Sequence, residues 1–577
     1  MFKRANKITA LLVAAASIMS VVPAMAATNL ETKDGTIEKA VAYKDGKYLY
    51  QGYRTEGDDT GLYFNAGDKD KKLDNATEIG SVGKYSDKYV QALDGSNEYI
   101  VDLSTGTISD NDTVSDLKST AQVKLQEKLN KTSRYGKGPG KITITQATGK
   151  GARFGAVWYE YSATTQASAT TTSDTTEYGA NDISYSGYVD QLGNYIDCSK
   201  NANIYVYNGT KMVKLDNLGD SDSSDGTTVT LNQINYMRTL SQDDKYIYRL
   251  VSAKVSGAVS VKTGLPEAND TLYYVQRISK AQGNTEKDAY LPQSTESFQI
   301  EDTSIIGNED VSNAFAAIDP LKSGIANYTG TKYYMVDGSM YVTFCEDGGT
   351  DKVKTIKLNL KTSTKLDEYK SGVKTGNKLD GHVVVKDSDK DQKADAWVVD
   401  ANKNVWALYQ GEILKSTKLG DFNSVYTCDK SFNTIDVYDD NNLIAWKKDG
   451  NAYTTVTKGT QQSQADAATT VTTAPAVTIG WKQDGANWTL FDATGTKVAN
   501  KWVNVSGVWY FLKADGVMAT GWHNDNGTWY FLKSSGAMAT GWYNDNGTWY
   551  FLNESGAMLA NTTVDGYILN ASGAWVK

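Results

Sequence analysis

The chain has 577 residues, and a chain of this length divides into about two to four domains. Charged residues make up 22% and hydrophobic residues 40%, which excludes a wholly disordered chain. The formal net charge is -9, and because an acidic chain repels a phosphate backbone, we expect no nucleic acid partner.

The first 26 residues are predicted to be a secretory leader. Lys3, Arg4 and Lys7 supply a positive start, residues 8–22 are apolar or small, and residues 23–26 read Pro-Ala-Met-Ala, the pattern of a cleavage site. The alternative is an uncleaved membrane anchor, but the apolar run is shorter than a membrane span and a cleavage site follows it. We therefore expect a secreted protein with no membrane span in the mature chain.

The body, residues 28–460, is predicted to be mainly β. The chain has 37 Tyr and 13 Trp but only 6 Pro, and aromatic residues favour strands. Short apolar runs are bounded by turn residues such as Asn208-Gly209, Asp337-Gly338 and Asp449-Gly450. The runs predicted to be strands include residues 48–50, 203–207, 246–248, 333–336 and 405–409.

One helix is predicted, from Val114 to Asn130. Leu117, Ala121, Leu125 and Leu129 recur at every fourth position, which places them on one helical face. A polar tract from Ser162 to Glu177 is predicted to be a second linker or a long exposed loop. It suggests a β-rich domain with this helix over residues 28–160 and a second β-rich domain over residues 180–460.

The arrangement of strands in the second domain has two interpretations. Its strand spacing over residues 330–460 predicts propeller-like blades, and tandem β-sandwich modules are the alternative.

An acidic run in the body predicts a calcium loop. Asp387, Asp389, Asp391 and Asp395 follow the pattern D-x-D-x-D-x-x-x-D between two predicted strands. Alternate carboxylates on a tight loop can converge on one calcium ion, for which oxygen ligands are preferred. The run is similar to the calcium loops of integrin-type propeller blades, although Gln392 stands where Gly is usual. A structural calcium ion is one interpretation, and a solvated turn is the other.

The sequence contains few of the residue patterns that are typical of known catalytic sites. The chain has only two histidines, His382 and His523, and His523 lies inside a repeat described below, so a zinc site built on a histidine pair is not expected. No G-x-S-x-G motif is present. A pair of carboxylates for glycoside hydrolysis depends on spatial position, so the sequence leaves that possibility open.

The strongest pattern is a repeat of 20 residues near the C-terminus, after a predicted linker at residues 461–479 that is rich in Ala and Thr. Trp502, Trp522 and Trp542 are evenly spaced, and so are two further series in the same copies. These two series are Trp509, Trp529 and Trp549, and Met518, Met538 and Met558. An earlier, looser copy contains Trp481 and Trp488, and a degenerate copy ends the chain with Tyr567 and Trp575.

Each copy is predicted to form a hairpin. Residues 529–532 read Trp-Tyr-Phe-Leu, a strand by composition, and residues 533–536 form a turn in which Gly536 can take a positive φ. Residues 537–540 are predicted to return as the second strand. Because a two-stranded hairpin does not fold alone in water, successive hairpins should stack into a β-solenoid over residues 480–577.

The motif GW-x6-WYFL-x3-GxMATGW resembles the choline-binding type of cell-wall-binding repeat, found on secreted proteins of Gram-positive bacteria and their phages. The resemblance covers about a sixth of the chain. It implies that aromatic residues of consecutive copies enclose the quaternary ammonium of choline on teichoic acid. The two end copies, which depart from the motif, would then act as caps. Whether Tyr530 or Phe531 faces the ligand stays open.

Carried over to this chain, the resemblance implies a set of wall-binding residues. They are Trp481, Trp488, Trp502, Trp509, Tyr510, Met518, Trp522, Trp529, Tyr530, Met538, Trp542, Trp549, Tyr550 and Met558. An electron-rich cage is a natural host for choline, since a desolvated cation–π contact contributes about 2 kcal/mol. A related repeat that grips glucan chains and a purely structural array are the alternatives.

We therefore predict a non-enzymatic surface protein held noncovalently to the cell wall. The last five residues show no hydrophobic tail and no LPxTG-like signal, which agrees with noncovalent attachment. The alternative is a wall-associated glycoside hydrolase that the same repeats target to its substrate.

Overall fold

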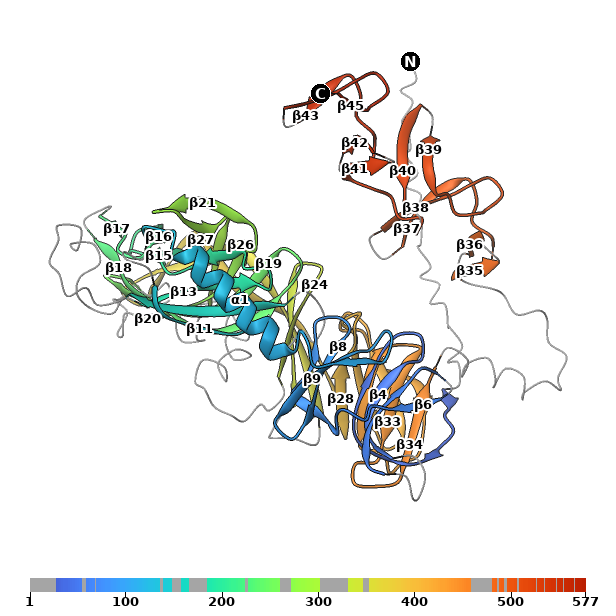
Figure 1. Cartoon of the computed structure of the whole chain (residues 1–577). Helices are drawn as coiled ribbons and strands as arrows, with labels where there is room; N and C mark the ends of the chain where they lie inside the picture. Colours follow the sequence, from blue (N-terminus) through green and yellow to red (C-terminus); the bar gives the residue numbers. More distant parts are fainter. Residues whose placement is uncertain are drawn as a thin grey trace, which may run out of the picture. The chain divides into compact units, whose positions relative to one another are not determined.

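The computed structural model divides the chain into two compact units, residues 1–467 and residues 468–577. Figure 1 shows both, and each is described by itself. The structure describes residues 27–53, 59–67, 69–134, 139–147, 157–165, 184–223, 227–259, 271–300, 331–345, 352–457, 480–484, 487–491, 496–505, 508–525, 527–533, 535–545, 547–553, 555–564 and 566–576. The predicted leader, residues 1–26, and the predicted linker, residues 461–479, lie outside these ranges.

Among the described residues, unit 1 has six larger sheets of mostly antiparallel strands and two small hairpins, and because the nine-stranded sheet has two halves, the larger sheets are numbered below as seven. The first three are β3 (Thr36–Ala42), β4 (Tyr48–Tyr53), β5 (Gly61–Asn65) and β6 (Asp70–Lys72); β7 (Glu78–Tyr85), β8 (Tyr89–Asp94), β9 (Asn97–Asp102) and β10 (Thr107–Ser109); and β11 (Pro139–Gln146), β12 (Trp158–Thr165), β13 (Ser184–Asp190) and β14 (Tyr195–Asp197).

The fourth and fifth sheets are the two halves of one nine-stranded sheet. The fourth holds β17 (Ser221–Asp222), β18 (Val229–Gln242), β19 (Tyr246–Ser256), β20 (Thr271–Ser279) and β23 (Thr295–Ile300). The fifth holds β27 (Val373–Lys393), β26 (Lys352–Lys370), β25 (Ser339–Cys345) and β24 (Lys332–Val336). The two halves join through the parallel pairing of Gln299 with Val383. Two small hairpins accompany them, β15 (Asn201–Tyr207) with β16 (Met212–Asn217), and β21 (Gln282–Glu286) with β22 (Ala289–Pro292).

The N-terminal strands complete the sixth and seventh sheets. The sixth is β1 (Thr28–Asn29), β31 (Asn423–Thr427), β30 (Glu412–Ser416), β29 (Val405–Tyr409) and β28 (Ala396–Val399). The seventh is β2 (Lys33–Asp34), β34 (Ala452–Val456), β33 (Asn442–Trp446) and β32 (Thr434–Asp439). Because β1 pairs with β31 and β2 with β34, the first and last strands of unit 1 hold each other in place.

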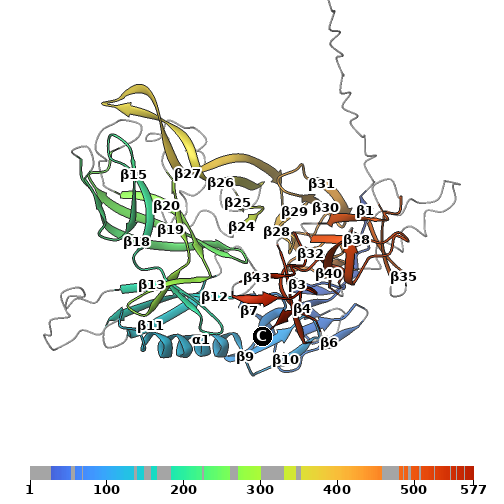
Figure 2. The ribbon, with the colours of Figure 1, turned by 90° about the horizontal axis from the view of Figure 1, so that it is seen from above.

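Seven hydrophobic clusters join these sheets in a closed cycle, the order of blades in a β-propeller. Figure 2 shows the sheets following one another around unit 1. Successive residues of a strand face opposite neighbours, as Ala407 and Leu408 of β29 do. One buried residue from each side of each cluster marks the cycle: Leu49 and Val90, Ile100 and Ile144, Trp158 and Ile247, Leu250 and Val342, Tyr334 and Ala407, Leu408 and Val437, and Ile444 and Tyr48.

The predicted helix is confirmed as α1 (Val114–Leu129). Thr113 begins it with a capping box, in which its side chain accepts from the Asp116 backbone and Asp116 accepts from the Thr113 backbone. Ala121, Leu125 and Leu129 are buried between the second and third sheets. The helix therefore fills the junction between two blades.

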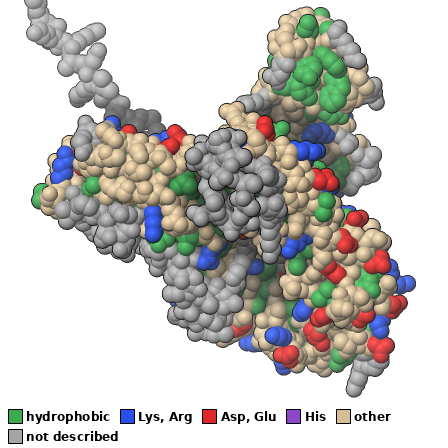
Figure 3. Space-filling model, turned by 60° about the vertical axis from the view of Figure 1, so that its left-hand side comes forward, with side chains coloured by type: hydrophobic (Ala, Val, Ile, Leu, Met, Phe, Trp, Pro, Cys, Tyr) green, Lys and Arg blue, Asp and Glu red, His purple; other side chains and the backbone are tan. Residues whose placement is uncertain are grey.

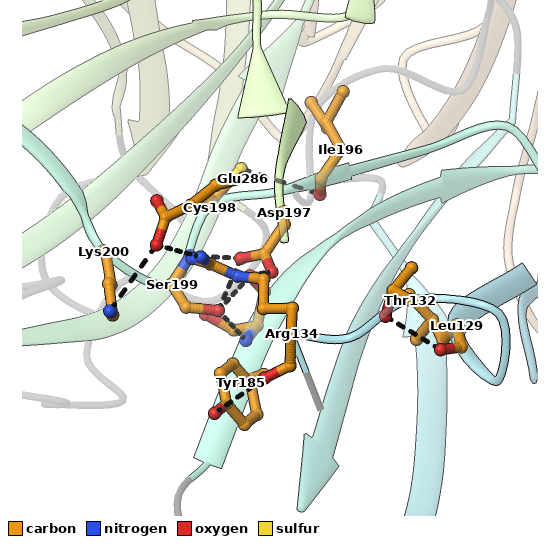
Figure 4. A network of polar contacts seen from close by, with 11 residues as sticks. Leu129, Thr132, Arg134, Tyr185, Ile196, Asp197, Cys198, Ser199, Lys200 and Glu286 are labelled. Carbon is orange, nitrogen blue, oxygen red and sulfur yellow. Dashed lines mark hydrogen bonds and ion pairs between the residues drawn. The ribbon is translucent and has the colours of Figure 1, made fainter. Parts of the chain in front are cut away.

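A buried ion pair fastens the chain just after α1. The Arg134 Nε lies 2.6 Å from an Asp197 carboxylate oxygen, and both side chains are fully buried (Figure 4). Glu286 reaches the same guanidinium at 2.7 Å, and the Arg134 backbone N–H donates to the Lys287 carbonyl. These contacts tie the end of the helix to β14 and to the β21–β22 hairpin.

The fold class predicted from the sequence, mainly β with several sheets, is confirmed. The five strands named above each fall within an observed strand. The polar tract predicted from Ser162 begins inside β12, which runs to Thr165 and pairs with β13. The division into residues 28–160 and 180–460 stays a prediction, and the helix cluster contains residues from both sides of it.

Unit 2 is a series of four hairpins and a final three-stranded sheet. The hairpins are β35 (Gly480–Asp484) with β36 (Asn487–Phe491), β37 (Lys501–Val505) with β38 (Val508–Leu512), β39 (Gly521–Asp525) with β40 (Thr528–Leu532), and β41 (Gly541–Asp545) with β42 (Thr548–Leu552). The final sheet is β43 (Thr562–Val564), β44 (Tyr567–Leu569) and β45 (Trp575–Val576).

The pairing within each hairpin differs from the prediction. Trp529 to Leu532 do form a strand, but their partner is β39, which precedes them, because the intervening Asn-Gly pair favours a tight hairpin turn. Gly536 does take a positive φ, of 79°. Residues 537–540 form no second strand, and Met538 makes only an isolated bridge with Leu532. The prediction of a strand there is wrong.

Candidate aromatic binding site

The functional side chains of unit 2 gather at the junctions between consecutive hairpins. At the best-defined junction, Trp522 lies edge-on to Tyr550 of the next hairpin, with ring centroids 4.7 Å apart. Trp529, from the same hairpin as Trp522, lies at 6.4 Å and nearly perpendicular to it. Met558 packs in the same cluster, and its backbone N–H donates to the Trp529 carbonyl. Three rings and a thioether therefore surround one junction.

The same set recurs at four junctions. The first is Trp481, Trp488, Tyr510 and Met518; the second is Trp502, Trp509, Tyr530 and Met538; the third is Trp522, Trp529, Tyr550 and Met558; and the fourth is Trp542, Trp549, Tyr567 and Trp575. The first tryptophan of each set lies 5.1, 4.8, 4.7 and 5.3 Å from its tyrosine, in that order.

The second tryptophan of each set is exposed. Trp488, Trp509, Trp529 and Trp549 keep 37, 44, 44 and 41% of their surface accessible, and they are the exposed tryptophans among the described residues. In the same strand as Trp529, Phe531 and Leu532 are buried. Figure 3 shows hydrophobic side chains gathered on the surface of the array, at the upper right. Indoles that served only to stack the hairpins would be expected inside, as Phe531 is.

Backbone contacts set the spacing between copies. Met518, Met538 and Met558 donate their backbone N–H groups to the carbonyls of Trp488, Trp509 and Trp529, each in the preceding hairpin. Gly536 lies so close to Met518 that a Cβ there would be 2.1 Å from its sulfur. Gly556 and Gly573 meet Met538 and Met558 in the same way. Glycine at this place in the repeat lets neighbouring copies approach closely.

A carboxylate fixes the first tryptophan at two junctions. The Trp502 indole N–H donates to Asp525 at 2.9 Å, and the Trp522 indole N–H donates to Asp545 at 2.9 Å. Beside these contacts, His523 stacks on Phe511 at 3.9 Å, and Tyr543 lies tilted against Phe531 at 4.1 Å. In these two copies the residue after the first tryptophan therefore packs against a phenylalanine of the preceding copy.

All fourteen wall-binding residues predicted from the sequence lie at these four junctions, although no ligand tests their role. The question of Tyr530 or Phe531 has a geometric answer, because Tyr530 faces Trp502 across the junction whereas Phe531 is buried. Sequence reasoning missed Tyr567, Trp575, Asp525 and Asp545. Aligning Gly573-Ala574-Trp575 with Gly556-Ala557-Met558 would have revealed the first two.

The geometry suits a cation without hydrogen-bond donors. Indole and phenol rings present negative faces, and a quaternary ammonium enclosed by them is held by cation–π attraction and by burial of its methyl groups. The exposed indole of each set leaves one side of the arrangement open to solvent.

The predicted calcium loop is not a loop. Asp387, Asp389 and Asp391 lie within strand β27, opposite lysines of β26. Lys357 lies 2.8 Å from Asp387 and Lys352 lies 2.9 Å from Asp391, and these contacts lower the pKa of both carboxyls. Asp395 accepts from the Gln410 backbone. No cluster of three possible metal ligands occurs among the described residues. Calcium binding stays a prediction.

His382 lies in unit 1, and His523 lies in the array. His382 stacks on Tyr205 at 3.7 Å, and burial lowers its pKa. No helix among the described residues has the length and apolar character that crossing a membrane requires.

Comparisons with known proteins agree with the repeat motif. A family model described as a choline-binding repeat matches residues 519–562, and one described as a cell wall binding repeat matches residues 500–518. A comparison with curated protein sequences found no match.

Among solved structures, the choline-binding domain of Spr1274 from Streptococcus pneumoniae is 44% identical over 14% of this chain and 96% of that domain, with a TM-score of 0.14. The pneumococcal cell wall endolysin of phage Cp-1, solved with choline, is 32% identical over 19% of this chain and 30% of the endolysin, with a TM-score of 0.14. Choline binding protein F of S. pneumoniae is 18% identical over 44% of this chain and 100% of that protein, with a TM-score of 0.17.

The two family models and the repeated Trp, Tyr and Met positions lead to one assignment. The C-terminal region of this chain belongs to the family of choline-binding, cell-wall-binding repeats.

Proposed function

We propose that the array holds this protein noncovalently on a bacterial cell wall by binding choline groups of wall polymers such as teichoic acid. The observation that carries the proposal is the pair of indoles at each of four junctions, one exposed and the other facing a tyrosine from the next copy. In this proposal the protein is exported through its leader and stays on the cell surface.

The energetics explain why the site is repeated. One aromatic enclosure that contributes about 2 kcal/mol of cation–π attraction, together with apolar burial, reaches roughly millimolar affinity, which is about 4 kcal/mol. Linked sites on a polymer that carries many choline groups gain about 10²–10⁴ through effective concentration. Four weak junctions can therefore anchor a chain that one junction would release.

Unit 1 is proposed to be the displayed, non-enzymatic part. The sheets of unit 1 follow one another in a cycle that β1 and β2 help to close, and the sequence offers no catalytic template within this unit. A zymogram of the full chain on purified cell wall tests this part of the proposal. We expect no lytic band, and a band would instead assign unit 1 to wall hydrolysis.

Wall retention tests the anchor. The full chain, bound to purified choline-containing cell wall, should be eluted by millimolar choline and not by dextran. Combined replacement of Trp509, Trp529 and Trp549 by alanine should abolish retention. Ile568→Ala is a matched control, because Ile568 is 57% exposed in the same array but belongs to no junction set. Elution by dextran alone, or full retention of the triple variant, would overturn the proposal.

A further inference from the structure

Two of the four junctions share one further contact. At the second and third junctions, the first tryptophan donates its indole N–H to a carboxylate, Trp502 to Asp525 and Trp522 to Asp545, both at 2.9 Å. Each carboxylate ends the first strand of the hairpin that also supplies the facing tyrosine. Asp525 and Tyr530 of one hairpin therefore contact the same indole.

Such a contact acts on binding in two ways. A charge-assisted hydrogen bond is short and directional, so it holds the indole in the orientation in which its face meets the cation. The carboxylate also adds negative charge at the rim of a site that receives a positive ligand. A half-buried tryptophan without this contact has more rotational freedom to lose when the ligand binds.

The first junction provides an internal comparison. Residues 502–505 read Trp-Val-Asn-Val, where residues 522–525 read Trp-His-Asn-Asp. In the repeat, Val505 therefore aligns with Asp525, and a valine side chain accepts no hydrogen bond. Trp481 and Tyr510 still meet at 5.1 Å, so the aromatic part of this junction is formed.

We propose that Asp525 and Asp545 are positioning residues that strengthen the second and third junctions, and that the first junction binds its ligand more weakly because Val505 stands in their place. This inference rests on the proposed function. It makes the array a graded set of sites in which the first junction is weaker than the second and third.

The test uses full chains with one active junction. Replacing Trp488, Trp529 and Trp549 by alanine leaves the second junction, and replacing Trp509, Trp529 and Trp549 leaves the first. Choline binding is measured by isothermal titration calorimetry, with circular dichroism to confirm folding. We expect the second junction alone to bind at least about threefold more tightly than the first alone, as a charge-assisted contact implies.

Exchange variants separate positioning from general damage. In the second-junction chain, Asp525→Val should weaken choline binding at least about threefold. Asp525→Asn keeps a hydrogen-bond acceptor without the charge, so its choline affinity should lie between those of the parent chain and Asp525→Val. In the first-junction chain, Val505→Asp should strengthen binding, a gain that a merely structural role for the carboxylate would not produce.

The outcomes distinguish this inference from the proposal beneath it. If neither parent chain binds choline, the proposed function fails and this inference fails with it. If the parents bind equally well and neither Asp525→Val nor Val505→Asp changes the dissociation constant, the carboxylates do not set affinity and only this inference is overturned. If Asp525→Val does not fold, the comparison of parents and the Val505→Asp result decide.

Discussion

Trp529 and Phe531 show how burial divides two roles within one strand. Trp529 is 44% exposed and Phe531 is 8% exposed, although only one residue separates them. We predict that Trp529→Ala lowers the stability of unit 2 by only about 1 kcal/mol, because much of the Trp529 side chain is already exposed to solvent in the folded protein. Phe531→Ala, which empties a core position, should cost about 3–5 kcal/mol.

Thermal unfolding and choline titration of the same two variants check this contrast. Trp529→Ala should fold normally and bind less choline. Equal loss of stability in both variants would mean that the exposed indole is a core residue, and the proposed division of roles would be wrong.

Asp387 carries the pH dependence of the β26–β27 ion pairs. The Lys357 ammonium lowers its pKa, so its contribution to stability is present above the unfolded pKa near 3.9 and is lost as pH falls through the lower folded pKa. We predict that Asp387→Asn costs less than about 1 kcal/mol at pH 7, since the pair is partly exposed. The difference from the native chain should vanish in acid.

The same variant addresses calcium. Because Lys357 and Lys352 already pair with Asp387 and Asp391, we expect calcium chloride to leave the unfolding midpoint of the native chain unchanged. A rise in the midpoint that disappears in Asp387→Asn would show that calcium displaces the lysines and that the sequence-based prediction was right.

At the scale of elements, the turn glycines of the array differ in how much space surrounds them. Gly536 and Gly527 both take a positive φ, of 79° and 90°. A Cβ at Gly536 would strike the Met518 sulfur, whereas a Cβ at Gly527 would meet nothing within 4 Å. Gly527→Ala should therefore cost about 1–2 kcal/mol from backbone strain alone, and Gly536→Ala should cost clearly more.

Denaturant unfolding of the two glycine variants, followed by tryptophan fluorescence, measures the difference. Equal costs would show that Met518 moves aside freely, and that the close approach of copies does not depend on glycine.

In unit 1, the Arg134–Asp197 ion pair connects the end of α1 to β14. Both side chains are fully buried, so removing one leaves a buried charge. We predict that Arg134→Met destabilises unit 1 by about 3–5 kcal/mol and that adding Asp197→Leu recovers part of the loss. Chemical denaturation of the single and double variants measures this. A double variant less stable than Arg134→Met would mean that Asp197 stabilises the fold through its contacts with Ser199 instead.

Local patterns predicted the elements better than their pairing. The helix at Val114 and the strand at Val405 follow from periodicity and turn residues, which act over a few positions. The hairpin partner of Trp529 was misassigned because two turns flank that strand, and the Asn-Gly turn before it forms the hairpin. The Asp387 run alternates as a strand does, but its carboxylates suggested a loop because the facing lysines are distant in sequence.

At the scale of the whole molecule, the closure of unit 1 lay beyond sequence reasoning. Thr28 pairs with Tyr426 and Lys33 pairs with Tyr453, contacts that no local pattern encodes. The candidate site was more predictable, because a 20-residue period repeats the same side chains at every junction. Its last junction was missed where Trp575 replaces methionine, since the prediction followed residue identity and not position.

Choline titration of the full chain, followed by tryptophan fluorescence, tests the central claim most directly. We predict a saturable change at millimolar choline that is absent in the chain lacking Trp488, Trp509, Trp529 and Trp549 and is not reproduced by a glucan oligosaccharide. A native chain whose fluorescence choline leaves unchanged, while the same chain responds to glucan, would contradict the assignment of these junctions to a quaternary ammonium.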